Sequence, residues 1–180
     1  ALGDELTAGR VQDVLEPVSG NPMAKHVLET AVLDAELKTA GLSFGRYLGA
    51  VRDRVPAGVS VGIMDSHAEL LDHVDRYLAQ GYRRIKLKIE PGWDVEPVRL
   101  VRERFGDDLL LQVDANAAYT LADARQLARL DPFDLLLMEQ PLNEADIRGH
   151  ASLARHVSTP ICLDESIRSA RDAATAIALG

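Results

Sequence analysis

The sequence predicts an α/β fold, specifically part of a (β/α)8 TIM-type barrel of about five strand–helix units preceded by a helical segment. The main observation is that short β-branched or leucine-rich runs alternate with helical stretches beyond Pro56. Connections of a few residues between them imply right-handed crossovers and hence a parallel sheet. A content of 47% hydrophobic and 27% charged residues is typical of a globular chain.

The first part of the chain is predicted to be helical. Apolar residues recur at helical spacing over 23–38, and Asn21-Pro22 before them suits a helix start. Residues 41–56 contain three glycines and a proline, which is typical of a linker. We therefore place a domain boundary near Pro56, which gives domains 1–55 and 56–180.

The second part contains five apolar runs that are predicted to be strands. They cover 59–64, 83–89, 109–114, 135–138 and 161–163, and the helices between and after them are expected at 66–80, 95–105, 121–130, 144–156 and 170–179. This alternation fits either an open doubly wound sheet or a barrel. A dinucleotide-binding sheet needs a glycine-rich turn after its first strand, and this sequence has only Gly62 there, so the barrel is favoured.

Charge and cysteine content exclude several classes of partner. The net charge of −8 and the pI near 5.1 argue against nucleic acid or an anionic membrane surface as the partner. The lone Cys162 cannot form an intrachain disulfide, so a reducing cytoplasm is expected. The sequence shows no export signal at its N-terminus and no apolar run long enough to cross a membrane.

Charged residues recur at the carboxyl ends of the predicted strands, where the functional residues of a barrel lie. Lys86 and Lys88 are two apart in the second run, hence on one face of a strand. Asp114, Glu139 and Asp164 follow or end the next three runs, each about 25 residues after the last. We therefore expect the three carboxylates at equivalent places on adjacent strands, converging at one end of the barrel.

These residue types point to metal-assisted proton abstraction. Three oxygen ligands without sulfur or imidazole suit Mg²⁺. Two lysines near each other and near a cation are expected to have depressed pKa values, which makes one of them a usable general base. A proton could then be removed next to a carboxylate, with the metal stabilising the enediolate.

A purely structural interpretation has to be weighed against this one. A single carboxylate at a strand end is more often a helix cap, and two lysines alone could be solvated residues of an edge strand. Three carboxylates at regular intervals after a lysine pair favour a functional site. Lysines without a charged partner inside a barrel would cost too much free energy to be kept for structure alone.

The motifs resemble those of a known enzyme group. KLK at 86–88, DAN at 114–116, EQPL at 139–142 and DES at 164–166, in this order and spacing, resemble the muconate-lactonising subgroup of the enolase superfamily. From about Asn21 onward the chain resembles actinobacterial N-acylamino acid (N-succinylamino acid) racemases that also act as o-succinylbenzoate synthases. The resemblance implies that 1–55 is the last, helical part of an α+β capping domain and that 56–180 carries strands one to five of the barrel.

The resemblance also implies roles for individual residues. Lys88 corresponds to the base, Lys86 to the lysine that contacts the substrate carboxylate, and Asn116 and Glu165 to polar residues around the metal. The implied metal ligands are Asp114, Glu139 and Asp164. The cofactor would be Mg²⁺, with Mn²⁺ or Co²⁺ as substitutes. The expected protein is a cytoplasmic homo-oligomeric lyase or isomerase that acts on a small-molecule carboxylate, either in menaquinone biosynthesis or in amino-acid metabolism.

The sequence departs from the family pattern in its length. The family has a second catalytic lysine on the sixth strand, about 25 residues beyond Asp164 and therefore past Gly180. We expect the chain to be a fragment that lacks strands six to eight, and the isolated piece to be unstable and inactive.

Several alternatives stay open from the sequence. Dipeptide epimerase and muconate cycloisomerase share every motif quoted. A barrel lyase in which Lys88 forms a Schiff base is a different class of enzyme. A metal-binding module without turnover is a third possibility.

Overall fold

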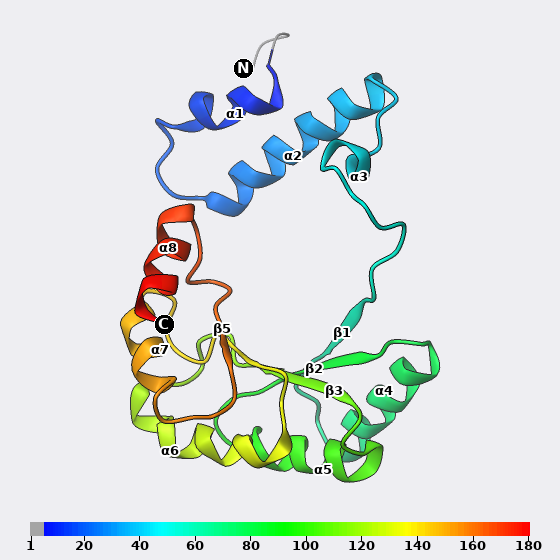
Figure 1. The fold of residues 1–180 in the computed structure, drawn as a ribbon, viewed down its shortest axis with the longest axis vertical. Coiled ribbons are helices and arrows are strands. Elements are labelled where there is room, and N and C mark those ends of the chain that lie inside the picture. The colour runs from blue at the N-terminus through cyan, green and yellow to red at the C-terminus, as the bar shows by residue number, and fades with distance from the viewer. Residues whose placement is uncertain (1–5) are drawn as a thin grey trace. The chain divides into compact units, whose positions relative to one another are not determined.

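The structure is a computed structural model and describes residues 6–180 (Figure 1). The N-terminal segment, for which the sequence analysis expects no export signal, lies partly outside these residues. The chain divides into two compact units, unit 1 (Ala1–Val55) and unit 2 (Pro56–Gly180). Within the described residues, no helix is both long and apolar enough to cross a membrane.

Unit 1 consists of helices α1 (Ala8–Leu15), α2 (Pro22–Thr39) and α3 (Phe44–Tyr47). Pro22 starts α2, where a missing N–H costs nothing, and the bounds confirm the helix expected over 23–38. Helix α1, which is not among the predicted helices, is held on α2 by the fully buried Val11 and by a 3.1 Å hydrogen bond from Ala8 N–H to Glu36 Oε1. Helix α3 lies within the segment expected as a linker and is capped by Ser43.

Unit 2 is built on a parallel sheet of five strands in the order β1-β2-β3-β4-β5. The strands are β1 (Gly58–Val61), β2 (Arg84–Lys88), β3 (Leu110–Asp114), β4 (Met138–Glu139) and β5 (Ile161–Cys162). A doubly wound sheet reverses its strand order at a switch point, whereas here the spatial order follows the chain throughout. The sheet is therefore of the barrel type, as the sequence predicts.

Helices follow each of the five strands and lie along one side of the sheet (Figure 1). They are α4 (His67–Ala79), α5 (Val95–Phe105), α6 (Ala124–Leu127) between two 3₁₀ segments, α7 (Ile147–Leu153) and α8 (Ala170–Leu179). Right-handed crossovers in a constant direction place every connecting helix on the same side. The opposite face of the sheet is left to polar residues.

The two faces of the central strands differ in chemistry. Ile85, Leu87, Leu111 and Val113 are at most 1% exposed and form the core toward the helices. The alternate residues of β2 and β3 point to the other face, since successive side chains of a strand alternate. These are Lys86, Lys88, Gln112 and Asp114.

The fourth strand and its helix differ from the sequence prediction. Only Met138 and Glu139 form a regular strand in place of the predicted 135–138, although the Leu136 N–H still donates to the Leu111 carbonyl of β3 at 2.8 Å. Helix α7 is shorter than the predicted 144–156. It starts late because Asp146 caps it by accepting the Gly149 N–H at 2.8 Å. A Cβ on Gly149 would clash with the Asp146 carboxylate, so a larger residue there would displace this cap.

Other element bounds also shift slightly. Strand β1 ends at Val61, short of the predicted 64. The helix expected at 121–130 is broken into 3₁₀, α and 3₁₀ segments up to Phe133. Pro132 lies in the last segment, where it has no N–H to donate to the Ala128 carbonyl as a regular α-helix needs.

Two polar side chains, Asp131 and Arg102, anchor the chain before the amino ends of the strands. Asp131 accepts hydrogen bonds from the Ser158 and Thr159 N–H groups and from the Thr159 hydroxyl at 2.8 to 2.9 Å, which fixes the chain before β5. Arg102, 8% exposed, donates to backbone carbonyls before β3 and β4. These anchors set strand position from the end opposite the carboxylates.

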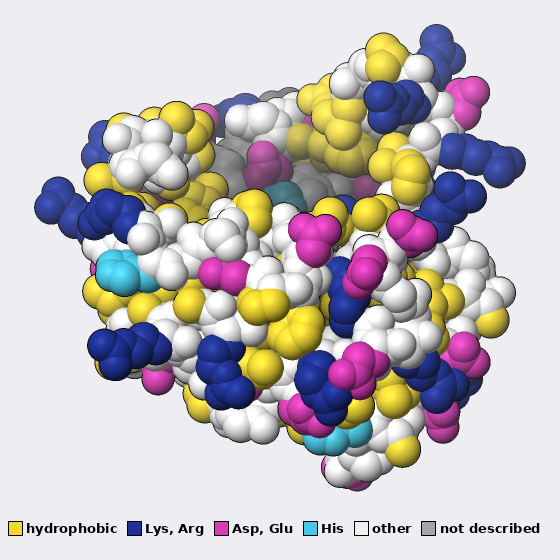
Figure 2. Space-filling view, turned by 60° about the horizontal axis from the view of Figure 1, so that its bottom comes forward, with side chains coloured by type: hydrophobic (Ala, Val, Ile, Leu, Met, Phe, Trp, Pro, Cys, Tyr) yellow, Lys and Arg dark blue, Asp and Glu magenta, His cyan; other side chains and the backbone are white. Residues whose placement is uncertain are grey.

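The helix-covered face of unit 2 carries a mixed surface. Figure 2 shows Lys and Arg side chains interspersed there with Asp and Glu, so this face presents no broad field of one charge sign. The absence of a nucleic-acid or membrane partner stays a prediction.

Candidate active site

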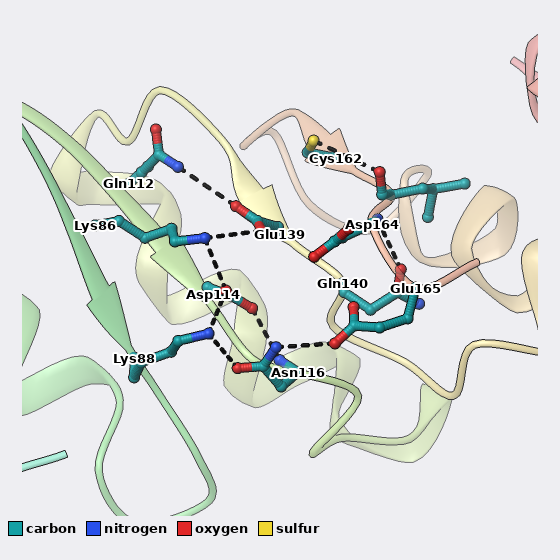
Figure 3. A network of polar contacts seen from close by, with 11 residues as sticks. Lys86, Lys88, Gln112, Asp114, Asn116, Glu139, Gln140, Cys162, Asp164 and Glu165 are labelled. Atoms are coloured by element: carbon teal, nitrogen blue, oxygen red, sulfur yellow. Dashed lines mark hydrogen bonds and ion pairs between the residues drawn. The ribbon is translucent and has the colours of Figure 1, made fainter. Parts of the chain in front are cut away.

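A row of charged residues crosses three neighbouring strands at their carboxyl ends. Lys88 is the register partner of Asp114, and Asp114 is the partner of Glu139. Parallel pairing places the three side chains on the same face, where Figure 3 shows them turned toward one another. One layer earlier, Lys86 pairs in register with Gln112.

The two lysines contact the carboxylates directly. Lys86 Nζ lies 2.9 Å from Glu139 Oε1 and 3.0 Å from Asp114 Oδ2, so one ammonium bridges two strands. Lys88 Nζ lies 2.6 Å from the same Asp114 oxygen and also donates to Asn116 Oδ1. Asp114 is 1% exposed and the lysines 25% and 30%, so the ion pairs are partly shielded from water.

These contacts change the proton affinities of the site. Burial acts to raise the pKa of Asp114, but hydrogen bonds from Lys88, Lys86 and the Asn116 N–H outweigh it and lower that pKa below 3.8. Burial acts to lower the pKa of Lys86, but its hydrogen bonds to Glu139 and Asp114 outweigh it and raise that pKa above 10.5. The pKa of Lys86 is raised because two carboxylates lie against the ammonium, and the depression expected beside a bound cation stays a prediction.

The loop after β3 links the row to β5. Asn116 Nδ2 donates to Glu165 Oε1 at 2.9 Å, and the Asn116 N–H donates to Asp114 Oδ1 at 3.0 Å. Asn116 and Ala117 both have positive φ, 41° and 64°, which is unfavourable for residues with a side chain. Such strain directly after Asp114 is typical of a functional loop.

Asp164 is not in register with the other carboxylates. The register partner of Glu139 is Cys162, so Asp164 lies two residues beyond it, past the end of β5. The equal spacing in the sequence predicts equivalent places on the strands, and for Asp164 this is wrong. Strand β5 ends at Cys162, two residues before Asp164, whereas β3 and β4 end at Asp114 and Glu139 themselves. An offset of two keeps the same face, and Figure 3 shows the Asp164 carboxylate pointing toward Glu139.

Two glutamines of the site escape the sequence analysis. Gln112 is 7% exposed, and its Nε2 lies 3.5 Å from Glu139 Oε2. Gln140 is fully buried between the ends of β4 and β5. The sequence feature that could have revealed Gln112 is its place two residues before Asp114, hence on the same face of the strand. For Gln140 it is the position between Glu139 and a proline at the end of the strand.

The donor chemistry fits a hard cation. Among residues 6–180, no three His, Cys, Asp or Glu side chains lie together as a metal-holding group. Asp114 and Glu139 nevertheless converge on one positive charge, the Lys86 ammonium, which stands where a cation would interact with both carboxylates. The buried Glu165 Oε2, which has no hydrogen-bond partner in the described part of the chain, is a further nearby acceptor.

A separate apolar groove of about 430 Å³ lies between α7, β5 and α8. Ile161, Leu163, Ala173 and Ile177 contribute to its lining. It lacks the charged groups that a carboxylate substrate needs, so the carboxyl ends of the strands are the candidate active site.

A parallel barrel-type sheet with a lysine pair and carboxylates at its strand ends defines the class of protein, a barrel α/β protein with its site at the carboxyl ends of the strands. A family model described as "Enolase C-terminal domain-like" matches residues 69–180, more than half of the chain. The chain belongs to this enolase family.

Individual relatives agree with the family. The chain is 68% identical over 177 residues to an N-succinylamino acid racemase of Amycolatopsis sp, a match that covers 98% of this chain and 48% of the relative. It is 47% identical over 170 residues to an o-succinylbenzoate synthase of Enterococcus faecalis, which covers 94% and 46%. A crystal structure of an enolase superfamily member from Listeria innocua superposes with a TM-score of 0.86 at 39% identity, over 99% of this chain and 48% of that one. The chain thus spans about half the length of the relatives it matches.

Proposed function

We propose that the complete protein removes a proton next to a carboxylate, as an o-succinylbenzoate synthase, an N-acylamino acid racemase or both. The observation that carries the proposal is the lysine pair on one face of β2 in direct contact with Asp114 and Glu139. Similarity to relatives named for these two activities supports the choice of reaction. The substrate would be a small-molecule carboxylate with an N-acyl or succinyl group.

Each charged residue has a role in this reaction. Lys88 would take the proton at its Nζ, because it lies at the end of β2 beside Asp114. Lys86, one layer deeper, would bind the substrate carboxylate and stabilise its charge. Hydrogen bonds from Asn116 to Glu165 and to Asp114 would hold the loop after β3 in place.

Mg²⁺ is the cofactor that the donor set supports, with Mn²⁺ or Co²⁺ as substitutes. Asp114, Glu139 and Asp164 would hold it, and the two lysines, which here contact Asp114 and Glu139, would then turn to the substrate. When bound, Mg²⁺ supplies positive charge that stabilises the enediolate. Racemisation also needs a second base on the opposite face of the substrate, which the family pattern assigns to a lysine on a sixth strand.

The test uses protein from the complete reading frame, incubated with Mg²⁺ and N-succinyl-L-phenylalanine in D₂O. Proton NMR should show loss of the α-hydrogen signal, and EDTA or Lys88→Ala should abolish that loss. Lys38→Ala, a control on an exposed lysine that pairs with Asp34 on its own helix, should leave it unchanged.

Other outcomes separate the alternatives. No exchange together with no synthesis of o-succinylbenzoate would reject the proposal in favour of the epimerase or cycloisomerase relatives. Borohydride trapping of a substrate adduct on Lys88, or activity that persists in EDTA, would favour a Schiff-base lyase. We also propose a homo-oligomer, and a monomeric mass in sedimentation analysis would contradict it.

A further inference from the structure

Gln140 is a fully buried polar residue directly after Glu139 at the end of β4. Its φ of 39° lies in the left-handed region, which a residue with a side chain adopts only when its surroundings demand it. A buried amide must find partners for its oxygen and for both hydrogens.

The side chain of Gln140 finds these partners at the end of the neighbouring strand. Its Oε1 accepts the backbone N–H groups of Asp164 at 2.9 Å and Ser166 at 3.2 Å. Its Nε2 donates to the Ser166 hydroxyl at 2.7 Å and to the Leu142 carbonyl at 3.0 Å. Because backbone N–H groups only donate, they fix which end of the amide is oxygen.

The backbone of Gln140 makes the same connection. Its N–H donates to the Cys162 carbonyl on β5 at 2.8 Å, and its carbonyl accepts the Ala117 N–H from the loop after β3 at 2.8 Å. One residue therefore joins the ends of the three strands that carry Asp114, Glu139 and Asp164.

Asp164 depends on this residue because it lies past the end of β5, outside the regular ladder. The Asp164 N–H has the Gln140 side chain as its hydrogen-bond acceptor, so the backbone that aims the Asp164 carboxylate is held by the residue next to Glu139. Outer residues that orient a ligand typically change metal affinity about 10- to 100-fold when they are mutated.

We propose that Gln140 is a positioning residue that fixes the backbone of Asp164 beside the end of β4 and so directs the Asp164 carboxylate for divalent cation binding with Glu139. The inference rests on the proposed function, since it assumes that these carboxylates bind the cation. It predicts that loss of the Gln140 acceptor weakens metal binding beyond any loss of stability.

The test compares two variants of the full-length protein. Gln140→Met keeps the side-chain length but removes the acceptor for Asp164 and Ser166. Asp131→Leu is the matched control, because it removes an acceptor of two backbone N–H groups, Ser158 and Thr159, before the amino end of β5. Free Mn²⁺ is measured by electron paramagnetic resonance during titration, well below the melting temperature of both variants.

Gln140→Met should raise the Kd for Mn²⁺ about 10- to 100-fold, whereas Asp131→Leu should leave it unchanged even where the loss of stability is similar. If Gln140→Met does not fold, Gln140→Asn replaces it, since it withdraws the same amide by about 1.5 Å and should also weaken binding. A wild-type Kd in the folded Gln140 variant overturns the inference alone. Failure of the wild type to bind Mn²⁺ overturns the proposed function and the inference with it.

Discussion

Arg102 and Arg99 lie one helical turn apart on α5 and predict opposite consequences of the same substitution. The guanidinium of Arg102 is buried and donates five hydrogen bonds to the carbonyls of 106, 107, 109, 133 and 134, at 2.8 to 3.2 Å. Arg99 instead pairs with Glu96 and Glu103, and its side chain is 39% exposed. If stability followed the number of ion pairs, Arg99 would contribute more to it than Arg102. Because Arg102 is buried, we expect Arg102 to contribute more.

The magnitude follows from the partners that each substitution leaves behind. A hydrogen bond from a charged donor contributes about 1.5 to 3 kcal/mol, so a simple sum over five would be about as large as a typical domain's whole stability. Water can reach some of the freed carbonyls, and removal of the guanidinium also removes its desolvation cost. We therefore expect Arg102→Met to lower the free energy of unfolding by about 3 to 5 kcal/mol, because it leaves several carbonyls without a donor at about 1 to 3 kcal/mol for each one that water does not reach.

The assay is urea denaturation of the full-length protein followed by circular dichroism, with Arg99→Met as the control. Arg99→Met should leave the free energy of unfolding nearly unchanged, because exposed ion pairs contribute little. A loss below about 1 kcal/mol for Arg102→Met would refute the reasoning, since such a value is ordinary for a surface substitution.

Three further outcomes are expected for the full-length protein. Saturating Mg²⁺ should raise the melting temperature by mass action and Glu139→Gln should remove most of that shift, whereas an equal shift in the variant would reject Glu139 as a ligand. The pKa of His150 lies below 6.5, chiefly because of burial. The contribution of neutral His150 to the free energy of unfolding should therefore be fully present above pH 6.5 and be lost as the pH falls through the lowered pKa. His150→Gln should remove this part of the pH dependence in denaturant titrations, and an unchanged slope would contradict the assignment. Leu111→Ala, at a fully buried site, should lower the free energy of unfolding by about 2 to 5 kcal/mol, and a loss under about 1 kcal/mol in the same titration would show that the core relaxes around it.

The sequence predicts the sheet and the main row of the site because both follow from residue alternation. Ile85 and Leu87 must face the core, which leaves Lys86 and Lys88 on the opposite face, and parallel pairing then brings Asp114 beside Lys88. No other arrangement of these alternating residues would bury the apolar ones.

The remaining features depend on contacts that sequence spacing does not contain. Asp164 is offset from Glu139 because strand ends depend on where each strand enters the sheet, and residue counts do not report this. The raised pKa of Lys86 depends on the approach of Asp114 and Glu139, which only the folded chain reveals. Gln140 stands within a motif, but its role appears only once its partners on the next strand are known.

The register of Lys88, Asp114 and Glu139 makes changes of chain length unequal in their effects. An extra residue in the exposed loop between α4 and β2 can be absorbed as a wider turn, because loops tolerate insertion. The same extra residue inside β3 would reverse every later side chain, so that Val113 would face the charged row and Asp114 the apolar core. Proteins that diverge from this one can therefore vary in the length of such loops. Within each strand, however, the alternation of residues must be kept, so that the carboxylates stay on the face opposite the apolar core.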